Sequence, residues 1–192
     1  MSLPSSGKPV TRKTALSLRD SFAADARARA SARIAERATE LLAARTTVAL
    51  YAPKGSEVDT LALDENLRAR GARVVYPRVV DGARVLEFHE AAPARLIASR
   101  FGLREPRADW RDVVGLVEID AFVVPGVAFD RAGGRLGFGR GHYDATLAAA
   151  SPRALRAGLA FEIQIVDDVP REAHDVGLDV VVTETASYRA PS

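Results

Sequence analysis

The segment IDAFVVPGVAFD (residues 119–130) begins with an unbroken apolar run. A strand with one face in water alternates apolar and polar residues, whereas a strand covered on both faces is apolar throughout. A glycine-rich loop follows directly, and HYDATLAAA (142–150) has the composition of a helix start. The chain therefore predicts a central strand of a parallel sheet that continues, from its carboxyl end, through a loop into a helix.

Strand and helix patterns alternate along the rest of the chain. Further strands are expected at residues 46–53, 73–77, 84–90, 154–161 and 178–184. An alanine-rich helix is expected from Ser21 to about Arg45, and a second helix ends at Gly71. Residues 91–118 are expected to be irregular. We expect one three-layer α/β/α domain over residues 1–192, with a mainly parallel central sheet and a loose tail at residues 1–10.

Composition narrows the functional classes. The 192 residues include no cysteine, which excludes disulfides and thiolate chemistry and suits a reducing compartment. Basic and acidic residues number 27 and 25 and are scattered, whereas nucleic-acid binders concentrate positive charge in a stripe. No apolar run approaches the roughly 20 residues that span a bilayer, and the N-terminus has no apolar signal core. We expect a cytoplasmic monomer with no nucleic-acid or membrane partner.

The loop GGRLGFGRGHYD (133–144) has the features of a phosphate site. It joins a strand end to a helix N-terminus, where free N–H groups and the helix dipole attract anions. Glycines 134, 137, 139 and 141 allow close backbone approach and positive φ, while Arg135 and Arg140 supply forked donors. Asp144 is suited to hold Mg²⁺. Neither common glycine motif for nucleotides is matched, so a glycine-rich turn with solvated arginines remains the alternative.

The longer stretch VVPGVAFDRAGGRLGFGRGHYDATL (123–147) resembles the signature of the 5-formyltetrahydrofolate cyclo-ligase family. Other segments resemble that family in the same order along the chain. They are KPVTR (8–12), YAPKGSEVDT (51–60), RFGLREP (100–106), AFEIQIV (160–166) and HDVGLDVVVTE (174–184).

The resemblance implies an enzyme that uses ATP and Mg²⁺ to close 5-formyltetrahydrofolate into 5,10-methenyltetrahydrofolate, releasing ADP and phosphate. The formyl oxygen is expected to attack the γ-phosphate, after which N10 closes on the activated carbon and phosphate leaves. This route needs no protein nucleophile, which is consistent with the absence of cysteine. The protein's contribution is then positioning and neutralisation of charge.

Site residues follow from the same resemblance. Arg140 and Tyr143 are the expected catalytic residues, with Arg140 stabilising charge on the transferring phosphoryl group. The ATP contacts are Lys8, Arg12, Arg135, Leu136, Gly137, Phe138, Gly139, Arg140, Gly141, His142 and Tyr143. For Lys8 and Arg12 the alternative is a pair of solvated charges near the terminus. His142 stands where many family members have tyrosine, so a contact that needs the phenol is in question.

The metal ligands implied by the resemblance are Asp144 and Asp175. The alternatives are a charge that complements the helix dipole for Asp144 and an ordinary turn residue for Asp175. The folate contacts are Ala52, Glu57, Phe129 and Gln164. A glutamate suits the pterin edge, whose N–H groups a carboxylate can accept together, although Glu57 also lies where a helix start favours an acid. Phe129 fits the core equally well.

Two other functions remain open from the sequence. One is a relative of the family that keeps the fold and the phosphate loop but acts on another metabolite, such as one of thiamine-related salvage. The other is a non-catalytic protein that binds reduced folate or nucleotide. Retention of Lys8, Arg12 and Glu57 argues against the first, because a repurposed site loses its substrate contacts first.

Overall fold

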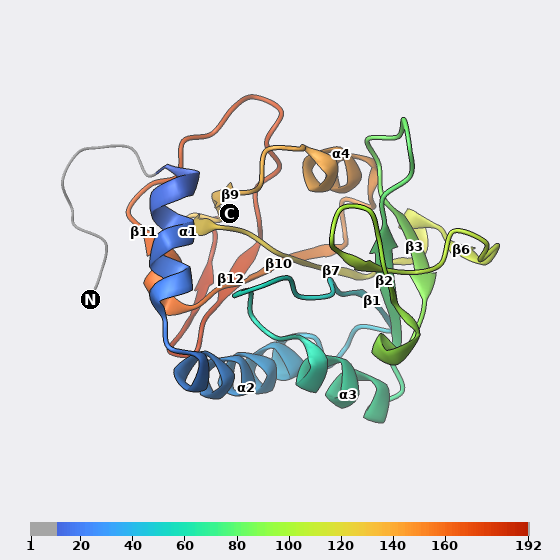
Figure 1. Ribbon diagram of the computed structural model, residues 1–192, viewed down its shortest axis with the longest axis horizontal. Helices are drawn as coiled ribbons and strands as arrows, with labels where there is room; N and C mark the ends of the chain where they lie inside the picture. Colours follow the sequence, from blue (N-terminus) through green and yellow to red (C-terminus); the bar gives the residue numbers. More distant parts are fainter. Residues whose placement is uncertain (1–10, 192) are drawn as a thin grey trace.

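The computed structural model describes residues 11–191, and within them a large mixed sheet forms the centre of the molecule (Figure 1). Its eight strands lie in the order β13-β12-β10-β7-β1-β2-β3-β6. Their bounds are β1 Thr47–Ala49, β2 Arg73–Arg78, β3 Glu87–Glu90, β6 Val113–Val114, β7 Ala121–Val124, β10 Leu155–Leu159, β12 Val180–Val182 and β13 Ser187–Arg189.

The five central strands, from β12 to β2, are parallel. In the middle of the sheet Val48 of β1 pairs with Val74 of β2 on one side and with Ala121 of β7 on the other. Antiparallel strands flank this block, with β13 beside β12 and with β3 and β6 beyond β2. The chain first moves outward from β1 to β2 and later returns to β7. The strand order therefore reverses between β1 and β7, the position at which open α/β sheets bind ligands.

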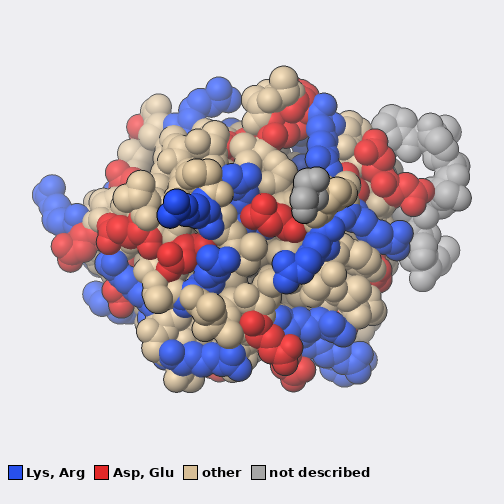
Figure 2. Space-filling model, turned by 180° about the vertical axis from the view of Figure 1, so that it is seen from behind, with Lys and Arg blue, Asp and Glu red and all other residues tan. Residues whose placement is uncertain are grey.

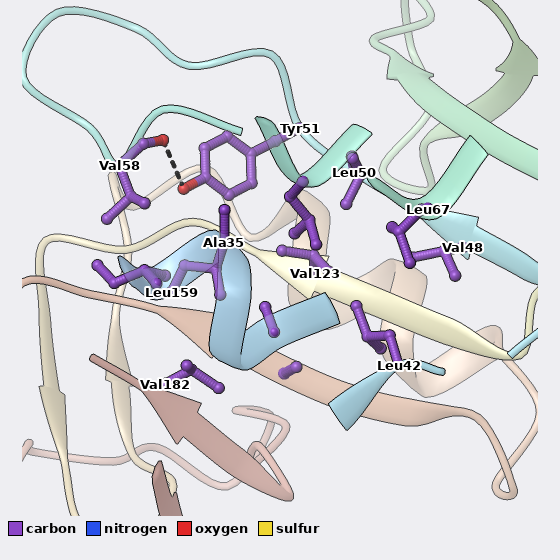
Figure 3. Close-up of a cluster of buried hydrophobic side chains, with 14 of the residues drawn as sticks. Ala35, Leu42, Val48, Leu50, Tyr51, Val58, Leu67, Val123, Leu159 and Val182 are labelled. Carbon is purple, nitrogen blue, oxygen red and sulfur yellow. Dashed lines mark hydrogen bonds between the residues drawn. The ribbon is translucent and has the colours of Figure 1, made fainter. Parts of the chain in front are cut away.

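Helices cover both faces of the sheet. α2 (Ala24–Leu41) and α3 (Leu61–Ala69) lie on one face, and α4 (His142–Ala149) lies on the other (Figure 1). The expected α/β class with a mainly parallel sheet is confirmed. Apolar side chains on the α2 and α3 side form one continuous core, in which Leu42 and Leu67 are fully buried and the Tyr51 hydroxyl donates to the Val58 carbonyl at 3.1 Å (Figure 3).

The N-terminal helical region differs from the expectation. In place of one helix from Ser21 to about Arg45, α1 (Arg12–Ser21) precedes α2, and the chain turns between them at Phe22 and Ala23. The Thr11 hydroxyl accepts a hydrogen bond from the Thr14 backbone N–H at 3.2 Å and so caps the first turn. α1 packs at the side of the molecule, where Ala15 is buried against Val127 and Val169.

The glycine-rich connection also differs from the expectation of a single loop. β8 (Ala128–Asp130) and β9 (Arg135–Leu136) form a short hairpin, and β11 (Ile165–Val166) pairs parallel with β8. Residues 91–118 are mostly irregular, as expected, with short elements among them. The remaining elements are β4 Ile97–Ala98, β5 Arg104–Glu105, and the 3₁₀ turns η1 Pro93–Arg95, η2 Leu116–Glu118 and η3 Glu162–Gln164.

Two surface properties bear on partners. None of the helices formed by residues 11–191 is both long and apolar enough to cross a lipid bilayer. On the face seen in Figure 2, basic and acidic side chains are interspersed.

Candidate active site

A cavity of about 640 Å³ opens at the carboxyl ends of the parallel strands. Its walls come from the residues that follow β1, β2 and β7, from the 99–105 segment, from the glycine loop and from the 170–175 segment. It thus occupies the place where the strand order reverses. The lining residues are Arg12, Tyr51, Ala52, Lys54, Glu57, Pro77, Val79, Arg84, Leu86, Phe101, Leu103, Arg104, Glu105, Pro125, 135–144, Pro170, Glu172, His174 and Asp175.

The glycine loop enters α4 through an unusual cap. Gly141, the N-cap residue, has φ 68° and ψ 7°, a left-handed conformation that strains residues with a Cβ atom. Gly139 also has positive φ, whereas the expected positive φ of glycines 134 and 137 is not found. At Gly134 the requirement is space, because an added Cβ atom would lie 2.1 Å from Oδ2 of Asp130.

Asp130 ties the glycine loop to the segment that carries Asp175. Its buried carboxylate accepts hydrogen bonds from the backbone N–H groups of Ala132 (2.9 Å) and Gly134 (2.7 Å) in the hairpin. The same carboxylate accepts from the Val169 N–H at 3.1 Å and from the Arg171 guanidinium at 3.1 Å. One side chain therefore sets the relative position of two cavity walls.

Arg135 and Asp144 form an ion pair at the base of the loop. The Arg135 guanidinium donates to Oδ1 of Asp144 at 2.7 Å, and both side chains are largely shielded from solvent. The Val176 N–H points to the same oxygen at 3.3 Å, so the adjacent Asp175 is brought to the same side of the cavity. Asp144 lies in the first turn of α4, as expected.

Two arginines from different segments complete the cationic side of the cavity. The Arg12 guanidinium, at the start of α1, donates to the Gly137 carbonyl at 2.9 Å. The Arg140 guanidinium lies over the Phe101 ring, 4.6 Å from its centroid. The Phe101 carbonyl in turn accepts from Lys54 Nζ at 2.9 Å, so the loop after β1 is linked to the 99–105 segment.

The cavity is also lined by a half-buried carboxylate, Glu57, whose charge acts on two phenols. Burial raises the pKa of Glu57, although the Lys54 N–H donates to its Oε2 at 2.8 Å and favours the charged form. Burial also raises the pKa of Tyr51 and of Tyr143, and the Glu57 charge adds to both shifts. Both phenols are therefore neutral hydrogen-bonding groups, and Glu57 lines the cavity as an acceptor for N–H groups of a ligand.

The sequence profile of the 5-formyltetrahydrofolate cyclo-ligase family matches residues 4–184 of the chain. The chain belongs to this family. A 5-formyltetrahydrofolate cyclo-ligase of Mycolicibacterium smegmatis is 38% identical over 141 residues, which are 71% of this chain and 73% of that protein. The Escherichia coli K12 cyclo-ligase is 36% identical over 140 residues, covering 71% and 77%.

Solved structures agree with the cyclo-ligase assignment. The NMR structure of Aquifex aeolicus 5,10-methenyltetrahydrofolate synthetase superposes with a TM-score of 0.81 at 32% identity, covering 94% of this chain and 91% of that one. The synthetase of Mycoplasma pneumoniae gives 0.73 at 25% identity, covering 90% and 96%. The resemblance seen in the sequence, and the prediction of an enzyme of this ligase family, are confirmed.

Most of the residues expected from the cyclo-ligase pattern line this one cavity. They are Arg12, Ala52, Glu57, all of residues 135–144 and Asp175. Lys8 lies outside the described residues. Phe129 and Gln164 are not among the lining residues. Phe129 is fully buried, where its ring fills the space beside Gly126 and Gly158, so its alternative as a core residue is the one found.

Gln164 is buried too and bonds to backbone instead of facing the cavity. Its amide nitrogen donates to the carbonyls of Gly126 (3.2 Å) and Val127 (3.0 Å), and its oxygen accepts from the Phe161 N–H. Nothing in the sequence around Gln164 indicates that its side chain bonds to backbone carbonyls. Several other residues that line the cavity were not predicted from the sequence. These are Tyr51, Lys54, Arg84, Phe101, Arg104 and Glu105. Lys54 directly follows the strand predicted at residues 46–53, where a ligand contact is expected, whereas Tyr51 lies within that predicted strand.

Proposed function

We propose that the protein catalyses the ATP- and Mg²⁺-dependent closure of 5-formyltetrahydrofolate to 5,10-methenyltetrahydrofolate, with release of ADP and phosphate. The observation that carries the proposal is that a single cavity brings together two chemically different sets of groups. Arginines and backbone N–H groups of the glycine loop form the first set, and the half-buried Glu57 carboxylate beside Tyr51 and Tyr143 forms the second. A triphosphate fits the first and the pterin edge fits the second.

Arg12, Arg135 and Arg140 are the groups we assign to the phosphates of ATP. Arg140 is held only by stacking on Phe101, so its guanidinium can turn toward a bound phosphoryl group without breaking an ion pair within residues 11–191. Arg135 is fixed by Asp144 and serves better to shape the site than to move. The N-terminal Lys8 joins this set on the strength of the family pattern alone.

The donor set fits a magnesium ion held mainly by its nucleotide. Among residues 11–191 no group of three or more side chains could hold a metal by itself. Mg²⁺ commonly takes one or two carboxylates and completes its shell with phosphate oxygens and water. Asp144 and Asp175 both line the cavity and are the carboxylates we assign to it. When bound, the ion would neutralise charge on the phosphates.

Catalysis in this proposal depends on placement. The formyl oxygen attacks the γ-phosphorus and ADP leaves. N10 then attacks the formyl carbon, phosphate leaves, and the proton of N10 departs with the phosphate. No bond to the protein forms, so the chain's task is to hold the two substrates in line and to exclude water. Glu57 and the backbone of Ala52 orient the pterin, and Arg140 follows the charge that develops on the transferring group. Gln164 and Phe129 support the wall from behind, through Gly126 and Val127.

We also propose a monomer without a nucleic-acid partner. Every wall of the cavity is supplied by one chain, and the face in Figure 2 has no stripe of positive charge. Light scattering behind a sizing column tests the first part, since a single species of about twice the 20.5 kDa chain mass would contradict it.

One assay decides among the candidate functions. Purified protein, 5-formyltetrahydrofolate and Mg-ATP should generate the near-ultraviolet absorbance of a methenyl folate, in step with ADP release. ADP release that requires a different metabolite would favour the relative with another substrate. Folate or nucleotide binding without turnover, by correctly folded protein, would leave only the non-catalytic function.

A further inference from the structure

A second depression lies at the other end of the sheet, near the start of β2 and the end of β3. We call it the Trp110 groove; its volume is about 540 Å³, within the range of small-molecule sites. His89, Arg95, Trp110 and Arg111 are the lining residues that matter here. Among the described residues, none lines both this groove and the candidate active site.

The unusual feature of the groove is His89. Its side chain is only 1% exposed, yet neither ring nitrogen has a hydrogen-bond partner among residues 11–191. The nearest carboxylate oxygen, on Glu87, is 3.7 Å from Nε2, beyond hydrogen-bonding distance. Burial and the nearby Arg78 lower the pKa of His89, so the ring is neutral and presents one N–H donor and one acceptor. Buried polar groups are normally paired, and an unpaired one that lines a groove points to a ligand.

The charge of the groove indicates what that ligand is. Arginines 68, 73, 95 and 111 line it against the acids Glu90 and Asp112, an excess of two positive charges. Two of the guanidiniums are already occupied. Arg68 pairs with Asp64, and Arg73 pairs with Glu90 and Glu118.

The other two guanidiniums are available. Neither Arg95 nor Arg111 forms a side-chain hydrogen bond or ion pair with any residue in 11–191. The Arg95 guanidinium stacks on the Trp110 ring, 4.7 Å from its centroid, and the His89 ring meets the same indole edge-on at 6.3 Å. A forked donor, an aromatic surface and an unpaired imidazole therefore meet at one place.

We infer that the Trp110 groove is a second ligand site, which takes a small anion bearing a carboxylate or phosphate group. Arg95 and Arg111 bind its oxygens above the Trp110 ring, and the enclosed His89 ring packs against the same indole from within the wall of the groove. Guanidinium binds carboxylate and phosphate with the same fork geometry, so the oxyanion is the shared chemistry. Because the groove and the candidate active site lie at opposite ends of the strands, this anion is not part of the substrate pair proposed above.

Trp110 supplies a direct readout, because it is the only tryptophan in the chain. Its fluorescence is followed during separate titrations with inorganic phosphate and with succinate, at constant ionic strength, beside a sodium chloride titration. A saturable change with phosphate alone identifies a phosphate-bearing ligand. A saturable change with succinate alone identifies a carboxylate ligand, and a saturable change with both identifies a site that binds either oxyanion. A change that is linear and equal to that in chloride overturns the inference.

Variants separate the groove from other anion sites. Arg111→Gln and Arg95→Gln should each weaken the saturable change by about fivefold or more, the loss expected for one charge-assisted bond pair. Arg153→Gln removes an equal charge from an exposed turn and should leave the titration unchanged. Arg140→Ala, in the candidate active site, should leave it unchanged as well. The inference fails if Arg140→Ala abolishes the response or if neither groove variant weakens it. Circular dichroism of each variant establishes that it is folded.

Discussion

The substitution Asp130→Asn tests whether one buried carboxylate holds two walls of the candidate active site together. Oδ1 accepts from Ala132 and Gly134, and Oδ2 accepts from Val169. An asparagine oxygen can keep the first two bonds, but its NH₂ group would then face the Val169 N–H. A buried backbone donor that loses its acceptor costs about 1–3 kcal/mol of stability. The Arg171 pair adds about 0–1 kcal/mol, since that side chain is 43% exposed and solvent screens it.

The expected loss is therefore about 1–4 kcal/mol, which for a chain of 192 residues lowers Tm by about 2–4 °C per kcal/mol. Thermal unfolding followed by circular dichroism measures it. Asp168→Asn is the matched control, because Asp168 lies in the same segment but is exposed, and its Tm should stay within about 1 °C of wild type. The KM for ATP should rise in Asp130→Asn and not in the control. An unchanged Tm for Asp130→Asn, or an equal drop in both variants, would refute the reasoning.

Three further predictions concern the cavity itself. Arg140→Ala should lower kcat about 10²–10³-fold, as loss of one electrostatic donor does. Its Tm should stay near that of wild type, because the substitution removes only the stacking on Phe101. A large drop in Tm with unchanged kcat would contradict this prediction. Because burial raises the pKa of Glu57, its carboxylate is lost at a higher pH than that of an ordinary glutamate. The KM for the folate should therefore rise as pH falls through that raised pKa, and Glu57→Gln should raise KM at neutral pH and remove this dependence, as steady-state kinetics across pH would show. Gly141→Ala places a Cβ atom on a residue in the left-handed conformation, which should lower the free energy of unfolding by about 1–2 kcal/mol, as measured by chemical denaturation. The KM for ATP should also rise. An unchanged KM would show that the conformation of this N-cap residue does not affect ATP binding.

The strands were the predictable part of this fold. Continuous apolar runs and short alternating segments located β1, β2, β3, β7, β10 and β12, because burial on one or both faces leaves a direct mark on composition. Their ends were placed less well, since residues such as 50–53 are apolar but belong to the loop that follows β1. β13 was missed because three residues at a sheet edge, two of them exposed, carry no apolar pattern.

The glycine loop was predicted in position but not in form. The sequence predicts a phosphate-binding connection between a buried strand and the following helix, and residues 135–144 line the cavity. The hairpin of β8 and β9 was not foreseen, because strands of three and two residues leave no periodic signal. The restraint at Gly134 was hidden for a similar reason. Only the folded structure shows that the Asp130 carboxylate packs against Gly134. The sequence argument attributed this glycine to a positive φ, whereas the position requires glycine because there is no space for a Cβ atom.

α1 shows why the rest of the site could not be reached from sequence alone. Its ten residues are mostly polar, with Ala15 and Arg19 the buried ones. At one end Arg12 bonds to Gly137 in the glycine loop; at the other, Arg19 donates to the Ser56 hydroxyl at 2.9 Å, beside Glu57. A short polar helix thus links the glycine loop to the loop that carries Glu57. Such a link depends on contacts 37 and 125 residues apart in the chain, which local patterns do not record. The residues that we assign to the chemistry can therefore be named from their motif, whereas the residues that hold them in place are identified only from the folded chain.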